Sequence, residues 1–182
     1  MKGAIMFDKL AEKRRSIKKY TDKPVEQVKI DKIIETALRA PSGRGARPWH
    51  LVVVTDQAMR EKLSAARPGG GAFVKDAAAA IVVCGDESVS NLWVEDCTIA
   101  AVTMQYAAAS LGLGSRWFNI RGNECKEGVT SRDYIAGIIG LPENLDVECI
   151  IAIGYPAEEA VPYKEEELRY NQVSYGSYGK RL

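Results

Sequence analysis

A short basic segment near the start of the chain has the composition of an anion-binding site. Arg14, Arg15 and Lys18 surround Ser16 in the sequence Arg-Arg-Ser-Ile-Lys. Guanidinium groups donate paired hydrogen bonds to phosphate oxygens, while lysine adds a compact charge and serine a neutral donor. In an extended chain Ser16 and Lys18 point to the same side, so they could share one ligand. The segment predicts a bound phosphate; a solvated basic helix end and a nucleic-acid contact are the alternatives.

The distribution of charge favours a small anion over a polyanion. The first 50 residues hold thirteen basic and six acidic side chains, a net charge of +7, whereas the other 132 residues carry a net charge of −6. Surfaces that bind nucleic acid usually combine a basic patch with aromatic side chains that stack on bases. The acidic remainder of the chain, and the lack of aromatic residues among the basic ones, argue against nucleic acid as a partner.

Side chains that could act as nucleophiles or metal ligands are few. His50 is the only histidine, which argues against zinc enzymes and Ser-His-Asp catalysis, and we expect it to be structural beside Trp49. The cysteines have no C-x-x-C spacing, and three of them fall in apolar stretches, so they predict reduced, buried thiols. We therefore expect no metal site and no catalytic side chain. The four cysteines are Cys84, Cys97, Cys125 and Cys149.

Glycine-rich segments invite a nucleotide-binding interpretation that their context does not support. None is followed by Lys and Ser or Thr, so no Walker A loop is present. Gly112 and Gly114 follow a predicted helix and precede a predicted strand, which is the reverse of the order in a dinucleotide-binding fingerprint. The Gly69–Gly71 segment predicts a flexible connector.

The elements that would position these residues follow from length and periodicity. A chain of 182 residues predicts one domain, spanning residues 1–182. The longest uncharged run, Cys97–Ser115, is rich in Ala, Thr, Ser and Gly and predicts a buried helix, not a membrane span. Met1 leads into a charged amphipathic stretch, so we expect a cytoplasmic protein. Apolar spacing predicts helices ending near Lys13 and covering Ile30–Leu38, Gln57–Ala66, Leu92–Leu111 and Arg132–Ile139, and strands at Leu51–Thr55, Ala80–Cys84, Arg116–Ile120 and Val147–Ile153.

Four segments, in order, resemble the motifs of the nitroreductase family of flavin enzymes. Arg14–Tyr20, followed by Pro24, resembles R-R-S-x-R/K-x-F/Y…P, and Ala40–Trp49 resembles A-P-S-G/S-x-N-x-Q-P-W. Leu111–Trp117 resembles L-G-L-G-[ST]-x-W, and Ile153–Pro156 resembles I-G-Y-P. Together they extend over roughly residues 7–160. The chain departs from the family in one loop where Gly45 replaces Asn and Arg47 replaces Gln, and in the loop before the second strand, where Gly70 and Gly71 stand in place of the Asn or Gln that the family often carries near the flavin.

The resemblance implies an α+β fold with a mainly antiparallel central sheet flanked by helices. It also implies an intertwined homodimer with an FMN in each of two interface sites, in which the tyrosine-rich extension 157–182 wraps the partner. The residues that it assigns to FMN are Arg14, Arg15 and Ser16 at the phosphate and ribityl chain, Lys18 at the pyrimidine edge, Pro41, Ser42 and Gly43 from the partner subunit, Arg47 near the ring, Phe118 and Asn119 through a backbone N–H, and Lys164 as a late phosphate contact.

The function implied is an FMN-dependent oxidoreductase. Hydride would pass from NAD(P)H through the flavin to a small conjugated acceptor, such as a nitroaromatic or a quinone, in ping-pong half-reactions. A reductive dehalogenase or flavin-fragmenting enzyme of the same fold, and a flavin-storage protein with little turnover, remain alternatives. If the resemblance misleads, a basic interaction module remains.

Overall fold

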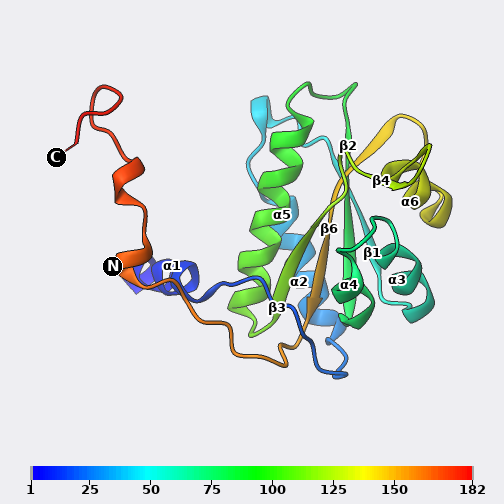
Figure 1. Ribbon diagram of the computed structural model, residues 1–182, viewed down its shortest axis with the longest axis horizontal. Coiled ribbons are helices and arrows are strands. Elements are labelled where there is room, and N and C mark those ends of the chain that lie inside the picture. Colours follow the sequence, from blue (N-terminus) through cyan, green and yellow to red (C-terminus); the bar gives the residue numbers. More distant parts are fainter. Residues whose placement is uncertain (1, 182) are drawn as a thin grey trace.

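A four-stranded antiparallel sheet forms the centre of the molecule (Figure 1). The computed structural model describes residues 2–181, with side chains described from residue 7 onward. The strands lie in the order β1 (Trp49–Val54), β2 (Ala79–Asp86), β6 (Leu145–Gly154) and β3 (Gly114–Asn119), and each neighbouring pair is antiparallel. The predicted α+β architecture with an antiparallel sheet is confirmed. The central strands β2 and β6 are almost wholly buried, because both of their faces are covered.

One face of the sheet is covered by α5 (Trp93–Ser110) and α2 (Gln27–Leu38) (Figure 1). The run from Cys97 to Ser115 contains no charged residue, so α5 can be buried over most of its length. Its small residues Ala100 and Ala101 are fully buried and pack with Ile81 and Ile151 of the central strands. Alanine allows close approach of helix and sheet without voids. The buried helix predicted from this run is confirmed.

The opposite face is covered by α3 (Gln57–Ser64), α4 (Ala72–Asp76) and α6 (Ser131–Ile139). Alternate strand residues point to this side, and Val82 and Ile150 pack with Leu63 and Ile135. The spacing analysis missed α4 and a small hairpin of β4 (Glu124–Lys126) with β5 (Val129–Thr130). Each is too short to produce a periodic apolar pattern.

The first helix and the last segment of the chain lie on the α5 side of the molecule (Figure 1). Helix α1 (Lys2–Lys13) packs there through Phe7, whose ring centroid is 5.2 Å from that of Tyr106. The segment after β6 runs past α1 and away from the sheet, with short 3-10 turns at η2 (Glu165–Glu167) and η3 (Tyr170–Gln172) (Figure 1). Its tyrosines are exposed in the single chain. Between residues 2 and 181, no helix combines the length and apolar character needed to cross a bilayer.

Gly85 on β2 allows the start of α5 to approach the sheet. A Cβ at this position would lie 2.5 Å from Cε3 of Trp93 and 2.9 Å from Sγ of Cys97. We therefore expect Gly85→Ala to lower the free energy of unfolding by about 1–3 kcal/mol, because the packed indole must move. Gly137→Ala on α6 is the control, since no atom lies within 4 Å of its added methyl group. Urea unfolding measures both, and equal stability of the two variants would contradict this packing.

Candidate functional site

The basic segment predicted to bind an anion lies along the outer edge of β3. Ser16 forms a parallel bridge with Ser115, and the N–H of Ile17 donates to the Ser115 carbonyl at 3.1 Å. Gly114 makes this approach possible, because a Cβ there would lie 2.5 Å from Cγ1 of Ile17. Ile17 is buried beneath the segment. The segment is therefore fixed in position at the beginning of the edge strand.

A cavity of about 280 Å³ lies beside this segment. Its lining includes Lys13, Arg14 and Arg15, residues 112–115, and the two acidic residues Glu158 and Glu159. Within residues 7–181, none of these three cations has a carboxylate within 4.0 Å. The Arg15 guanidinium instead lies 3.7 Å from the ring centroid of Tyr163. The three cations are therefore not directly paired, although they share the cavity with Glu158 and Glu159.

A carboxylate already occupies two backbone donors next to the cavity. The N–H groups of Lys18 and Lys19 both donate to Oε1 of Glu158, at 2.6 and 3.2 Å. Ala157 N–H also donates to the Lys19 carbonyl at 3.0 Å, so the chain leaving β6 runs beside this segment. Sequence reasoning missed Glu158, because 140 residues separate it from Lys18 and no spacing pattern links them. The contact holds the backbone at Lys18 and leaves its side chain exposed.

On β3, the two residues predicted to offer a backbone N–H to the flavin direct it to opposite sides of the strand. Since the Ser115 carbonyl points outward to Ile17, strand alternation directs the N–H of Asn119 outward and that of Phe118 toward β6. The Phe118 side chain is 1% exposed and packs edge-on against Phe73. Asn119 is exposed. Of this pair, Asn119 is the one that presents a donor at the free edge.

The second predicted group lies at the other end of α5. Gly43 begins the turn η1 (Gly43–Gly45), and its N–H donates to Oδ1 of the buried Asp96 at 2.7 Å. Ser42 Oγ accepts from the Arg47 N–H at 3.0 Å, and Arg47 has a left-handed φ of 48°. Asp96 lies near the beginning of α5, whereas Tyr106, which packs against Phe7 of α1, lies near its end. The ten residues between them span about 15 Å along the helix.

A single chain therefore does not bring Pro41, Ser42, Gly43 and Arg47 together with Arg14, Arg15, Ser16 and Lys18. Lys164 does not join either group. It lies in the exposed tail, where its Nζ is 3.9 Å from Oε1 of Glu166, and it does not line the cavity beside Arg14.

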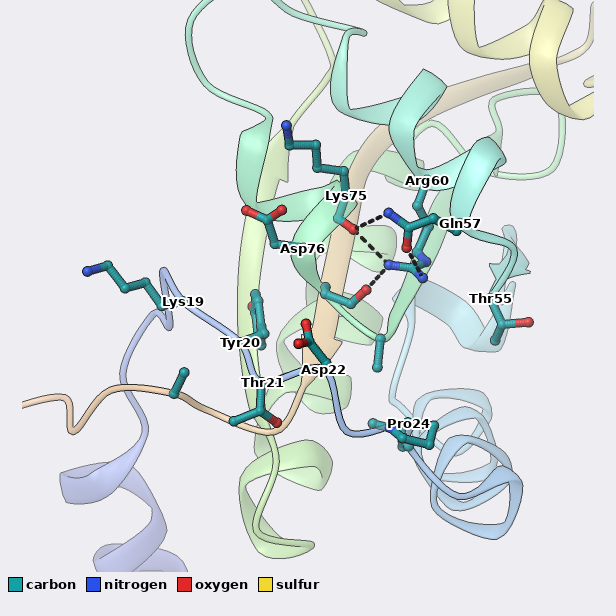
Figure 2. Close-up of a pocket in the computed structure, with 14 residues that line it drawn as sticks. Lys19, Tyr20, Thr21, Asp22, Pro24, Thr55, Gln57, Arg60, Lys75 and Asp76 are labelled. Carbon is teal, nitrogen blue, oxygen red and sulfur yellow. Dashed lines mark hydrogen bonds between the residues drawn. The ribbon is translucent and has the colours of Figure 1, made fainter.

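Another cavity, of about 660 Å³, lies elsewhere, and the hydrogen bonds at its centre serve the fold (Figure 2). Arg60 donates to the carbonyls of Lys75 and Ala77 and to Oε1 of Gln57. These bonds satisfy carbonyl groups at the end of α4, where the helix leaves them without internal partners. The cavity mixes Lys19 with Asp22 and contains none of the predicted cofactor residues.

The remaining reactive side chains do not form a catalytic or metal site. His50 lies exposed on β1, and within residues 7–181 no group of His, Cys, Asp and Glu is arranged to hold a metal ion. Burial raises the pKa of Cys84 and of Cys97 to about 12, and it also raises the pKa of Cys149. These three thiols therefore stay protonated at neutral pH.

Comparison with known proteins identifies the family. The sequence profile of the nitroreductase family matches residues 11–70 and 66–155. The chain belongs to the nitroreductase family. The resemblance drawn from its motifs is thus confirmed.

Its relatives include proteins of known structure. An FMN-dependent nitroreductase from Clostridium difficile R20291 is 41% identical, with a TM-score of 0.91 over 93% of this chain and 98% of that chain. A Methanothermobacter thermautotrophicus protein, provisionally named NADH dehydrogenase/NAD(P)H nitroreductase, is 42% identical over 151 residues, which are 80% of this chain and 74% of its own. An Archaeoglobus fulgidus protein with the same provisional name is 36% identical over 162 residues, 87% of this chain and 89% of its own.

The burial of the thiols predicts their chemical reactivity. Cys125 is partly exposed, with Sγ 3.3 Å from the Ala65 carbonyl, whereas the other three cysteines are buried. We expect one thiol per chain of the folded nitroreductase to react with Ellman's reagent, and four after unfolding in guanidinium. Cys125→Ser serves as the control and should abolish the reaction of the folded protein. Fast reaction of three or four thiols without denaturant would contradict the burial of the core cysteines.

Proposed function

We propose that this nitroreductase is an FMN-dependent oxidoreductase that takes hydride from NAD(P)H and passes it to a small conjugated acceptor, such as a nitroaromatic or a quinone. The observation that carries the proposal is the pair of arginines, Arg14 and Arg15, beside a cavity at the free edge of β3 with no carboxylate partner among the described side chains. The C. difficile relative is named FMN-dependent, and a Bacillus subtilis relative, 28% identical over 192 residues, is named FMN reductase (NAD(P)H).

The donors at this edge fit the parts of FMN. Two guanidinium groups and the Ser16 hydroxyl suit a phosphate, since forked donors and a neutral donor match its oxygens. The two backbone N–H groups of Lys18 and Lys19 hold the carboxylate of Glu158, which supports an affinity of this segment for oxyanions. A cavity of about 280 Å³ is small for a whole flavin, which supports placing the ring outside it, along the outer edge of β3.

The residues of the chain bind and tune the cofactor and supply no reacting group of their own. The chemistry that FMN supplies is reversible transfer of hydride at its ring. With FMN bound, Lys18 would place a positive charge at the pyrimidine edge, where it would stabilise negative charge and raise the reduction potential. The outward N–H of Asn119 would donate a hydrogen bond to the ring. Protons come from solvent, because no histidine or reactive cysteine lies at this edge.

The separation of the two groups of predicted residues supports an intertwined homodimer. Pro41, Ser42 and Gly43 lie about 15 Å along α5 from the phosphate-binding segment of their own chain, so a second copy would supply them. Ile99 and Val102 of α5 are each 38% exposed, and the tail tyrosines are exposed as well. Apolar and aromatic side chains of this kind favour a subunit interface. In this proposal each interface holds one FMN, with Arg47 near the ring and Lys164 near the phosphate, and the tail wraps the partner.

Colour and bleaching test the proposal. Purified protein should be yellow and should release FMN on denaturation, whereas colourless protein that cannot be reconstituted with FMN would refute it. Anaerobic mixing with NADH or NADPH should bleach the flavin within seconds, and addition of a quinone should restore the colour. Slow bleaching over hours would indicate a flavin-storage protein.

The phosphate assignment predicts loss of cofactor from one double variant. Arg14→Ala combined with Ser16→Ala removes a charged and a neutral donor, together worth about 3 kcal/mol. We expect FMN affinity to fall about 100-fold, measured by fluorescence titration of apoprotein. Lys32→Ala with Thr36→Ala removes an exposed cation and a hydroxyl from α2 as a control. Normal FMN affinity in the Arg14 and Ser16 double variant, with normal folding by circular dichroism, would refute the assignment.

A further inference from the structure

A second cationic cavity opens at the glycine-rich loop between α3 and α4. Its volume is about 380 Å³, and it is lined by the Gly69–Gly71 loop together with Arg67 and Lys75. None of its lining residues is acidic. Within residues 7–181, neither cation has a carboxylate within 4.0 Å. The cavity therefore holds two uncompensated positive charges.

Arg67 is held in place by an aromatic ring and by the loop. Its guanidinium carbon lies 5.2 Å from the ring centroid of Phe118, which is fully buried against Phe73. A Cβ at Gly70 would lie 2.6 Å from Nη2 of Arg67, so only glycine lets the guanidinium lie against the loop. A cation–π contact orients a guanidinium without neutralising it. Arg67 is thus positioned before any ligand arrives.

Lys75 contributes to the same cavity from α4. Its carbonyl accepts hydrogen bonds from Arg60 and Gln57, which hold the backbone of the helix end. In Figure 2 its side chain extends away from these two residues. The carbonyl thus serves the fold, while the amino group remains available to a ligand.

The cavity adjoins the part of β3 that lies away from the phosphate-binding segment. Ser16 pairs with Ser115 at one end of the strand, and Arg67 contacts Phe118, three residues further on. Three residues of a strand span about 10 Å. Arg67 therefore places the cavity near the Phe118 end of β3 and away from the FMN phosphate of the proposed function. Asn119, which offers its N–H to the flavin ring in that proposal, is the next residue along the strand.

We propose that Arg67, Lys75 and the Gly69–Gly71 loop form a subsite for the anionic group of a molecule that reacts at the flavin. This inference rests on the proposed function and names the substrate class of the same site. The group is an oxyanion, which a guanidinium binds through paired hydrogen bonds. Its two possible sources are a phosphate of the nicotinamide reductant and a carboxylate of the acceptor.

The test compares substrates that differ in one anionic group. Arg67→Met keeps the apolar contact with Phe118 and removes the charge, while Lys62→Met removes an exposed charge from α3 as a control. FMN content is measured first, followed by KM and kcat for NADPH and NADH, and for 4-nitrobenzoate and 4-nitrobenzyl alcohol. Calorimetric titration with NADP⁺ and NAD⁺ gives a readout that does not depend on turnover.

We expect Arg67→Met to raise KM about tenfold or more for the anionic substrate, with FMN content unchanged and kcat within twofold. A loss confined to NADPH assigns the subsite to the 2′-phosphate, an equal loss for NADH and NADPH assigns it to their shared diphosphate, and a loss confined to 4-nitrobenzoate assigns it to a carboxylate. Gly70→Ala, which displaces the guanidinium but keeps its charge, should produce the same selectivity change.

Two results would overturn the subsite. One is an unchanged KM for all four substrates in both Arg67→Met and Gly70→Ala, and the other is a uniform change across all four. Failure of the proposed function gives a different result, because wild-type protein would then hold no FMN and oxidise neither NADH nor NADPH. In that case calorimetric titration still tests the subsite, because it does not depend on turnover. Equal affinity of wild type and Arg67→Met for NADP⁺ would overturn the subsite.

Discussion

β3 is the last strand of the sheet on its side, so the N–H and C=O groups along its outer edge have no strand partner. The segment Ser16–Ile17 pairs with the first of these groups at Ser115 and goes no further. Because the direction of the N–H groups alternates along a strand, those of Trp117 and Asn119 also point outward, beyond the paired segment. The position of the basic segment and the outward N–H of Asn119 both depend on this edge, which is paired only at its beginning.

Aromatic rings hold the arginines along this edge where carboxylates would otherwise do so. Arg15 lies over Tyr163, Arg67 over Phe118, and Arg116 over Phe73 at 4.1 Å. A contact of this kind stabilises by about 0.5–2 kcal/mol and leaves the full charge in place. An ion pair would orient the side chain equally well but would cancel the field that a phosphate or carboxylate needs. Of these three arginines only Arg15 belongs to the basic first 50 residues, in which five of the thirteen basic side chains lie between Lys13 and Lys19.

The parts of the fold that could be predicted are those with long, uniform patterns. The apolar runs of β2 and β6 and the uncharged run of α5 gave correct elements, because burial on both faces demands such sequences. α4 and the β4–β5 hairpin were missed, since five, three and two residues carry no period. For the site, the motif at Arg14–Lys18 was placed correctly on an extended segment. The contact of Glu158 and the direction of each N–H on β3 depend on register and long-range pairing, which single-chain spacing does not encode.

The anchoring of the tail has a thermodynamic consequence. Tyr20 bridges to Pro156, Ala157 N–H donates to Lys19, and Glu158 accepts from Lys18 and Lys19. The tail thus leaves the sheet through the residues next to the basic segment, and any contact that orders one of them also orders the other. An anion that competed with Glu158 for these N–H groups would loosen the tail, whereas one that bound without displacing Glu158 would meet a segment that is already ordered. By linkage the coupling would be reciprocal, so docking of the tail would change the affinity for the anion by the same factor.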